Sequence, residues 1–262
     1  MITSLQCDIG KGLAYKGPTQ IARVVTEYWC ANNLYCAACL EEKLQEMPAN
    51  TKAFDFRCPN CAQTYQVKSQ RTLNLKKITD GAYSAMISAL KQNVAPNLLI
   101  LNYSPEWSVK NLVLFPSVIF TEEVLEKRNP LSSTARRAGW VGCNIVLDRV
   151  LPDARISMVS DTKIVPTNIV REKYANYRAL ETVPWEMRGW TLDVLNILKK
   201  IEGAEFDLAQ VYAHEKNLAQ VHPLNRNIKA KMRQQLQVLR DLGFVTFLGN
   251  GKYRTNISLL NT

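Results

Sequence analysis

Apolar and polar residues in the first 180 positions follow two periods, one helical and one alternating. Residues 19–30 place Ile21, Val24, Val25 and Tyr28 at helical spacing, which predicts an amphipathic helix with these four side chains inward. Residues 80–93 have the same spacing. Short strands are expected where alternation or apolar runs end at turn residues: 64–69, 97–104, 109–120 and 154–160. The pattern predicts an α/β domain, a mixed sheet flanked by helices.

A second pattern begins after residues 181–188, where a proline interrupts the periodicity. We therefore expect two domains, 1–182 and 183–262. The second domain is expected to contain these elements in order: a helix at 190–201, a short extended piece and a helix within 205–218, a helix at 225–242 and a hairpin at 244–256. Gly243 is expected to end the long helix, and Gly249, Asn250 and Gly251 to supply the tight turn. This order predicts a winged helix.

Charge adds a preference for polyanions. The 262 residues include 33 basic and 23 acidic side chains, giving a formal net charge of +10. Between Arg226 and Arg240 there are five basic residues and no acidic one. Such an excess favours phosphate-rich partners, because neutralised phosphates release counterions. No apolar run is long enough to span a bilayer and no secretory signal is evident, so no membrane partner is expected.

Four of the seven cysteines form two Cys-x-x-Cys pairs. The pairs are Cys36 with Cys39 and Cys58 with Cys61, separated by eighteen residues. Zinc prefers four thiolates in a tetrahedron, and this spacing is typical of such sites. Because cysteine fills all four positions, the predicted zinc site is structural. Such cysteine usage indicates an intracellular protein.

The second pair interrupts a hairpin that carries a candidate nuclease centre. Alternation places Gln66 and Lys68 on one face of a strand. If the knuckle at Cys58–Cys61 closes the hairpin, Asp55 stands beside them. Asp55, the Gln66 amide oxygen and the Val67 carbonyl would then ligate magnesium, and Lys68 would hold the attacking water. By itself this Asp…Gln-x-Lys motif is weak, and from the motif alone a solvated hairpin face is the better explanation.

Longer strings carry a more specific resemblance. Besides the two knuckles they are "ITDGAY", "TARRAGWVGCNI", "RGWTLDVLN", "KIEGAEF", "RQQLQVLRD" and "GKYR". Over nearly the whole chain, they make it resemble the DpnI-type restriction endonucleases. The resemblance implies a restriction-endonuclease-like core with a four-cysteine zinc site, followed by a winged helix. It also implies magnesium-dependent cleavage of duplex DNA at GATC when adenine carries an N6-methyl group.

One residue departs from the family pattern. The family has Glu-x-Lys where this chain has Gln66-Val67-Lys68. An amide ligates through oxygen but adds no charge, so weaker metal affinity is expected; Glu27 on the first helix is the nearest candidate to compensate, although a solvated helix residue is an equally good description of it. The resemblance further implies that Trp140 meets the methyl groups, with Arg136 and Arg137 near phosphates or base edges. Without it, Trp140 reads as a core tryptophan and the arginines as surface charges.

The third helix of the winged helix is the candidate for the major groove. Arginine suits guanine, asparagine and glutamine suit adenine, and lysines more often meet phosphates. The predicted DNA-binding residues on this helix and on the wing are Asn227, Lys229, Lys231, Arg233, Gln234, Gln237, Lys252 and Arg254. For any one of them, a solvated position is the simpler alternative.

Together these observations predict a methylation-dependent type II restriction endonuclease. The alternative is a methylated-DNA-binding regulator that does not cleave, which Gln66 keeps open. A zinc-ribbon transcription factor would leave the large mixed domain without a role. We expect the protein in the bacterial cytoplasm, as a monomer or a transient dimer on DNA.

Overall fold

The computed structural model describes residues 1–48 and 54–256, and divides the chain into two compact units, Met1–Arg178 and Ala179–Thr262. The predicted boundary lies four residues beyond this division. Among the described residues, no helix combines the length and apolar character needed to cross a bilayer.

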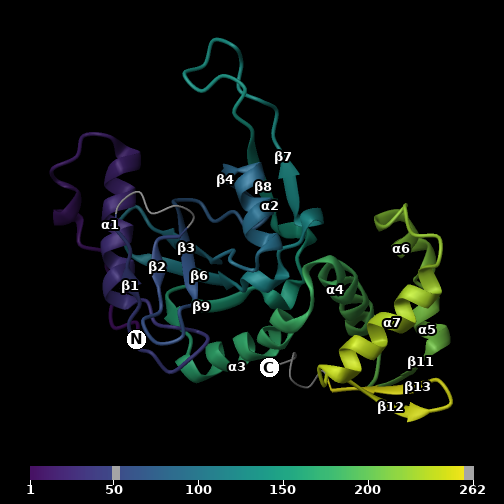
Figure 1. The fold of residues 1–262 in the computed structure, drawn as a ribbon. Coiled ribbons are helices and arrows are strands. Elements are labelled where there is room, and N and C mark those ends of the chain that lie inside the picture. The colour runs from purple at the N-terminus through teal and green to yellow at the C-terminus, as the bar shows by residue number, and fades with distance from the viewer. Residues whose placement is uncertain (49–53, 257–262) are drawn as a thin grey trace. The chain divides into compact units, whose positions relative to one another are not determined.

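The first unit is built on a seven-stranded mixed sheet with the order β1-β2-β3-β5-β6-β9-β10 (Figure 1). β3 runs parallel to β5, and the remaining neighbours are antiparallel. The seven residues of β5 are all buried, so the core of the unit surrounds this strand. The strand bounds are β1 Gln45–Glu46, β2 Phe56–Arg57, β3 Thr64–Gln70, β5 Asn97–Tyr103, β6 Val109–Phe115, β9 Ile156–Ser160 and β10 Lys163–Ile164.

Three longer helices accompany this sheet: α1 Pro18–Asn33, α2 Tyr83–Lys91 and α3 Thr167–Arg178. α1 packs against β3, and α3 against β9. The predicted inward face of α1 was partly wrong: Val25 is buried, but Tyr28 is 41% exposed and Trp29 and Cys30 are buried instead. The buried face instead contains Val25 and, four residues later, Trp29. Apolar residues occur on more than one side of this helix, so the sequence pattern did not show which side is buried. Short 3₁₀ turns fill several connections: Ile9–Gly12, Ser117–Ile119, Glu122–Val124, Leu147–Arg149 and Pro152–Ala154.

A separate three-stranded antiparallel sheet has the order β4-β8-β7. Its strands are β4 Lys77–Ala82, β7 Leu125–Lys127 and β8 Gly142–Val146. The loop 128–141 connects β7 to β8 and extends beyond both strands (Figure 1). We call these three strands and this loop the arm. The helical pattern at 80–93 overestimated α2, because residues 80–82 pair with β8 and the helix begins only at Tyr83.

The second unit has the element order of the predicted winged helix. After a 3₁₀ turn at Ala179–Thr182 come α4 Trp185–Lys200, β11 Glu205–Asp207, α5 Leu208–Tyr212, α6 Glu215–Val221, α7 Ile228–Asp241, β12 Val245–Gly249 and β13 Lys252–Thr255. The three strands pair in the order β11-β13-β12. The single helix expected within 205–218 is divided into α5 and α6.

Glycines end α7 and close the hairpin as expected. Gly243 follows the last turn of α7 with φ +82°, and Gly249, Asn250 and Gly251 have φ of +92°, +51° and +73°. These left-handed values strain most side chains but not glycine, and asparagine tolerates them. The α7 side chains predicted to face inward, Ile228, Met232, Leu236 and Leu239, are all buried.

Candidate active site and nucleic-acid interface

Asp55 is held beside β3 by two backbone hydrogen bonds and one side-chain hydrogen bond. Its N–H donates to the Tyr65 carbonyl at 2.9 Å, and its own carbonyl accepts from Met47 N at 2.9 Å. Its carboxylate oxygen Oδ2 accepts from Val67 N at 2.7 Å. Oδ1 makes no hydrogen bond to a described residue. The carboxylate is therefore fixed through one oxygen while the other remains available.

The Val67 carbonyl faces the same side of β3 as Asp55. In a strand, the N–H and C=O of one residue point toward the same neighbour. Val67 N–H reaches Asp55, so its C=O points toward the same side. Gln66 and Lys68 lie in the same strand with their side chains on a common face, and both are half-buried. The hairpin thus brings Asp55, Gln66, Val67 and Lys68 together.

Burial dominates the electrostatics of the carboxylates here. Burial raises the pKa of Asp55, and the Val67 N–H and the Lys68 ammonium group oppose that shift without cancelling it. Burial also raises the pKa of Glu27 on α1, and the nearby charges of Asp55 and Glu46 raise it further. Arg23 opposes this from one turn away, 3.9 Å from Glu27. Glu27 therefore lies close enough to Asp55 for the charge of Asp55 to raise its pKa. A carboxylate that compensated for the missing charge of Gln66 would need such a position.

Sequence reasoning missed Asp80. Its Oδ1 lies 2.9 Å from Nζ of Lys68, and the two side chains are 8% and 27% exposed. Asp80 belongs to β4, outside the hairpin that carries the motif. Only the tertiary structure brings this carboxylate to the lysine, so no local spacing could have indicated it.

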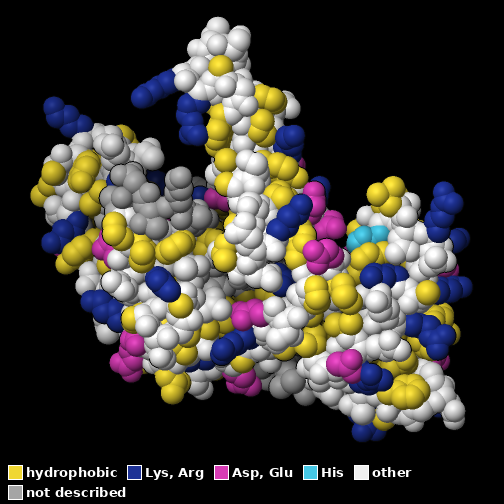
Figure 2. Space-filling view, viewed as in Figure 1, with side chains coloured by type: hydrophobic (Ala, Val, Ile, Leu, Met, Phe, Trp, Pro, Cys, Tyr) yellow, Lys and Arg dark blue, Asp and Glu magenta, His cyan; other side chains and the backbone are white. Residues whose placement is uncertain are grey.

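A cleft of about 820 Å³ opens beside β3, where Val67 and Lys68 line it, and Figure 2 shows the surface hollowed between α1 and the arm. α1, β3 and β4 supply most of its walls, and the aromatic side chains of Tyr103 and Trp107 close one side. Its charged lining residues are all basic: Arg23, Lys68, Arg71 and Lys77. A cleft with positive walls and no acidic lining residue among those described suits a phosphate backbone.

The four predicted zinc ligands form one cluster. The sulfur atoms of Cys36, Cys39, Cys58 and Cys61 all lie within 4.8 Å of one another. The pairs across the two knuckles are closer, with Cys36 Sγ 3.5 Å from Cys61 Sγ and Cys39 Sγ 3.6 Å from Cys58 Sγ. Four sulfurs at about 2.3 Å from a tetrahedral zinc would stand about 3.8 Å apart. The donor set and its spacing therefore fit zinc.

The cluster is joined to the rest of the unit by hydrogen bonds. The buried Tyr65 hydroxyl lies 3.2 Å from Cys36 Sγ and accepts from Ala37 N at 3.1 Å. Arg171 on α3 donates through Nε to the Cys36 carbonyl at 3.1 Å. Tyr65 is also the residue whose carbonyl holds Asp55. The knuckle interrupts the hairpin, but it fixes the strand that carries the candidate active-site residues.

The arm places Trp140 at the base of its loop. The ring is half-buried and packs over Gly142, where a Cβ atom would come within 2.8 Å of it. The Arg137 guanidinium lies 4.9 Å from the ring centroid, and Arg136 is exposed on the same loop. Trp140 is therefore neither a core tryptophan nor free of contacts.

The predicted DNA-binding residues of the second unit lie on one side of α7 and on the hairpin. Asn227, Lys229, Arg233, Gln234, Gln237, Lys252 and Arg254 are exposed, and Lys231 is half-buried. Two of the cations have acidic partners: Lys229 Nζ lies 3.3 Å from Glu215, and Arg254 lies 2.7 Å from Glu205. Dark-blue basic side chains gather along the edge of this unit in Figure 2.

Comparison with known families identifies both units. Residues 1–183 match the DpnI family, described as the Dam-replacing family, and residues 186–255 match its helix–turn–helix domain. The chain belongs to the Dam-replacing family. This is a family of restriction endonucleases, which supports nuclease activity for this Dam-replacing protein, and its second unit is the helix–turn–helix domain of that family. The predicted fold class, a mixed α/β core with a four-cysteine cluster and a C-terminal helix–turn–helix domain, is confirmed.

Proposed function

We propose that this Dam-replacing protein is a type II restriction endonuclease that hydrolyses both strands of duplex DNA at GATC sites methylated on adenine, with magnesium as cofactor. The observation that carries the proposal is the arrangement of Asp55, the Val67 carbonyl and Lys68 beside a cleft lined only by basic charges. The family match supports it independently.

Three oxygen atoms on the hairpin would hold the magnesium ion. They are Oδ1 of Asp55, the amide oxygen of Gln66 and the carbonyl oxygen of Val67. Oxygen ligands and few protein groups suffice, because magnesium retains several waters. When bound, the ion polarises the phosphate and lowers the pKa of a bound water.

The chain's own groups position the reactants. Asp55 is fixed by the Val67 N–H, so its free oxygen keeps a constant direction. Lys68 presents an ammonium group with three donors, one of which Asp80 engages. The remaining donors orient the attacking water and stabilise charge on the phosphate. Arg23 and Arg71, on the cleft wall, neutralise the flanking phosphates.

The arm and the second unit divide recognition between them. A methyl group on adenine is an apolar protrusion in the major groove, and the half-exposed face of Trp140 can receive it without desolvating a polar group. Arg136 and Arg137 contact phosphates or base edges beside it. In the second unit, α7 enters a major groove and the hairpin holds the backbone.

The zinc site supports this proposal only as scaffolding. Four cysteine sulfurs complete the tetrahedron, which leaves no position for substrate. Zinc would hold the hairpin through Tyr65 and take no part in hydrolysis.

Digestion of one plasmid, prepared with and without GATC adenine methylation, tests the proposal. We expect cutting of the methylated plasmid alone, in magnesium and not in chelator. Lys68→Ala should slow cutting by at least about 10²-fold, since it removes a donor to the developing charge. Lys216→Ala, an exposed lysine on α6, is the matched control and should cut normally.

Two results would contradict the proposal. Equal cutting of both plasmids would remove the methyl requirement. Preferential binding of methylated duplex with no cutting at any magnesium concentration would favour the non-cleaving regulator. Gln66→Glu would then be the first substitution to test.

A further inference from the structure

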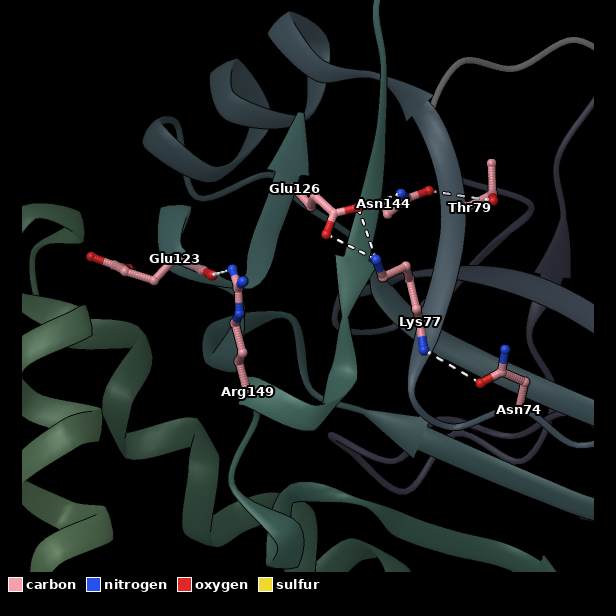
Figure 3. Close-up of polar contacts among 7 residues, drawn as sticks. All are labelled: Asn74, Lys77, Thr79, Glu123, Glu126, Asn144 and Arg149. Carbon is pink, nitrogen blue, oxygen red and sulfur yellow. Dashed lines mark hydrogen bonds and ion pairs between the residues drawn. The ribbon is translucent and has the colours of Figure 1, made fainter. Parts of the chain in front are cut away.

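The two faces of β4 have different surroundings. Alternate residues of a strand point to opposite faces. Lys77 and Thr79 are exposed, and Figure 3 shows Lys77 reaching Glu126, which also accepts from Asn144 at 2.9 Å. Ile78 and Asp80 point to the opposite, buried face. Asp80 is therefore the charged residue that β4 directs away from solvent.

On that face, Asp80 forms an ion pair with Lys68. Oδ1 of Asp80 and Nζ of Lys68 are 2.9 Å apart, and the carboxylate is only 8% exposed. The Lys77–Glu126 pair in the same sheet has the same 2.9 Å separation, but its side chains are 46% and 39% exposed. The register of β4 against β8 shifts between Asp80 and Ala82. Irregularities of this kind re-aim side chains and occur beside active sites.

A nuclease lysine benefits from such a partner. The lysine side chain has four rotatable bonds and a point charge, so it does not fix its own direction. A displacement of about 1 Å in a positioned group can slow a reaction about 10²-fold. Among the described residues, Asp55 forms no ion pair with Lys68, whereas Asp80 does.

We propose that Asp80 is a positioning residue that holds the Lys68 ammonium group in its working place for phosphodiester hydrolysis. The inference rests on the proposed function and names a residue outside the nuclease motif. It also ties the nuclease centre to the arm: Asp80 pairs in register with Cys143 on β8, and Trp140 precedes that strand by two residues. The lysine is thus held from the sheet that carries the loop with Trp140.

Asp80→Asn tests the inference, because it removes the charge and keeps the shape. The single-turnover rate on saturating methylated duplex should fall about 10- to 100-fold. The Kd for the same duplex in calcium should change less than twofold, and the melting temperature should change little. Asp80→Glu, which restores the carboxylate, should recover part of the rate. Glu126→Gln removes the matched charge from the exposed face of the sheet and should cut within threefold of the unaltered protein.

Two outcomes would overturn the inference. An Asp80→Asn rate within threefold of the unaltered protein would show that Lys68 needs no partner. A loss of binding or a large fall in melting temperature would assign Asp80 to folding or binding instead. Failure of the unaltered protein to cut methylated DNA would be a failure of the proposed function, and the two failures are thereby distinguishable.

Discussion

At the scale of single residues, the buried carboxylate of Asp55 has a cost to stability. Burial raises its pKa, and one N–H from Val67 with the nearby Lys68 does not fully compensate. A carboxyl whose pKa is higher in the folded than in the unfolded chain stabilises the fold at acid pH. That stability is lost as pH rises through the folded pKa.

Asp55→Asn should therefore raise the melting temperature at pH 7 when metal is chelated. The amide keeps an acceptor for the Val67 N–H and removes the buried charge. The difference should shrink as pH falls toward the ordinary carboxyl pKa. Thermal unfolding between pH 4.5 and 8 measures it, with Asp148→Asn, a 57% exposed carboxylate, as control. A lower melting temperature for Asp55→Asn at pH 7 would contradict the account.

We expect Gln66 to affect how strongly the proposed site binds magnesium. Gln66→Glu adds a negative charge to a site whose other ligands contribute one, so the magnesium concentration for half-maximal cutting should fall about tenfold. Titration of the initial cutting rate with magnesium measures this. Gln92→Glu adds the same charge at the exposed end of α2 and should leave the titration unchanged. An unaltered midpoint for Gln66→Glu would place Gln66 outside the metal site.

At the scale of elements, the arm depends on a close approach between a ring and a glycine. A Cβ atom on Gly142 would lie 2.8–2.9 Å from Trp140. Because Gly142 begins β8, the ring is fixed on the first residue of a paired strand. The position of Trp140 therefore depends on the sheet rather than on its loop alone.

Gly142→Ala should displace the Trp140 ring and weaken the preference for methylated DNA. We expect the ratio of cutting rates on methylated and unmethylated duplex to fall about tenfold, as it should for Trp140→Ala. The melting temperature checks that the unit still folds. A full preference retained in Gly142→Ala would show that the ring's position does not decide methyl recognition.

The cysteine cluster should bind one zinc ion per chain. Cys39→Ser removes one thiolate and should abolish stoichiometric zinc, with a lower melting temperature, because zinc binding contributes to folding. Elemental analysis of purified protein measures the zinc. Cys7→Ser, a buried cysteine outside the cluster, should retain it. Zinc-free protein with an unchanged melting temperature would contradict a structural zinc site.

At the scale of the whole molecule, positive charge appears in both units. The cleft of the first unit is lined by four basic residues, and the exposed side of α7 adds others in the second. Phosphate contacts of this kind make affinity fall steeply with salt, whichever sequence is bound. Binding should therefore depend on salt through both units.

Arg233→Ala should cost about 1 kcal/mol of binding free energy. If Arg233 contacts a phosphate, the loss should be uniform across sequences and the salt slope should fall by about one; if it contacts guanine, one base position should relax. Anisotropy titrations at several salt concentrations measure both. Arg240→Ala is the matched control, because Arg240 lies at the far end of α7 and forms an ion pair with Asp241 at 2.8 Å. No change for Arg233→Ala would remove α7 from the interface.

Local patterns were enough for the elements and for the motif. Helical and alternating periods, glycine turns and cysteine spacing depend on neighbouring residues, so β3, β5, β6 and β9, the winged-helix order and the four-cysteine cluster could be predicted. Asp55 could be placed opposite Gln66 and Lys68 because one short hairpin joins them. The face of α1 and the start of α2 were predicted wrongly where two periods fitted the same residues, and helix α3 and the short strands β4, β7 and β8 were not predicted.

Only the tertiary structure determined which residues from distant segments of the chain lie close together. Asp80 reaches Lys68 only because the fold brings β4 close to β3, and the charge of Asp55 raises the pKa of Glu27 only because α1 packs on β3. The basic walls of the cleft come from separate elements for the same reason. Sequence spacing records neighbours along the chain, whereas the surroundings of a charge depend on contacts between segments, which only the folded chain defines.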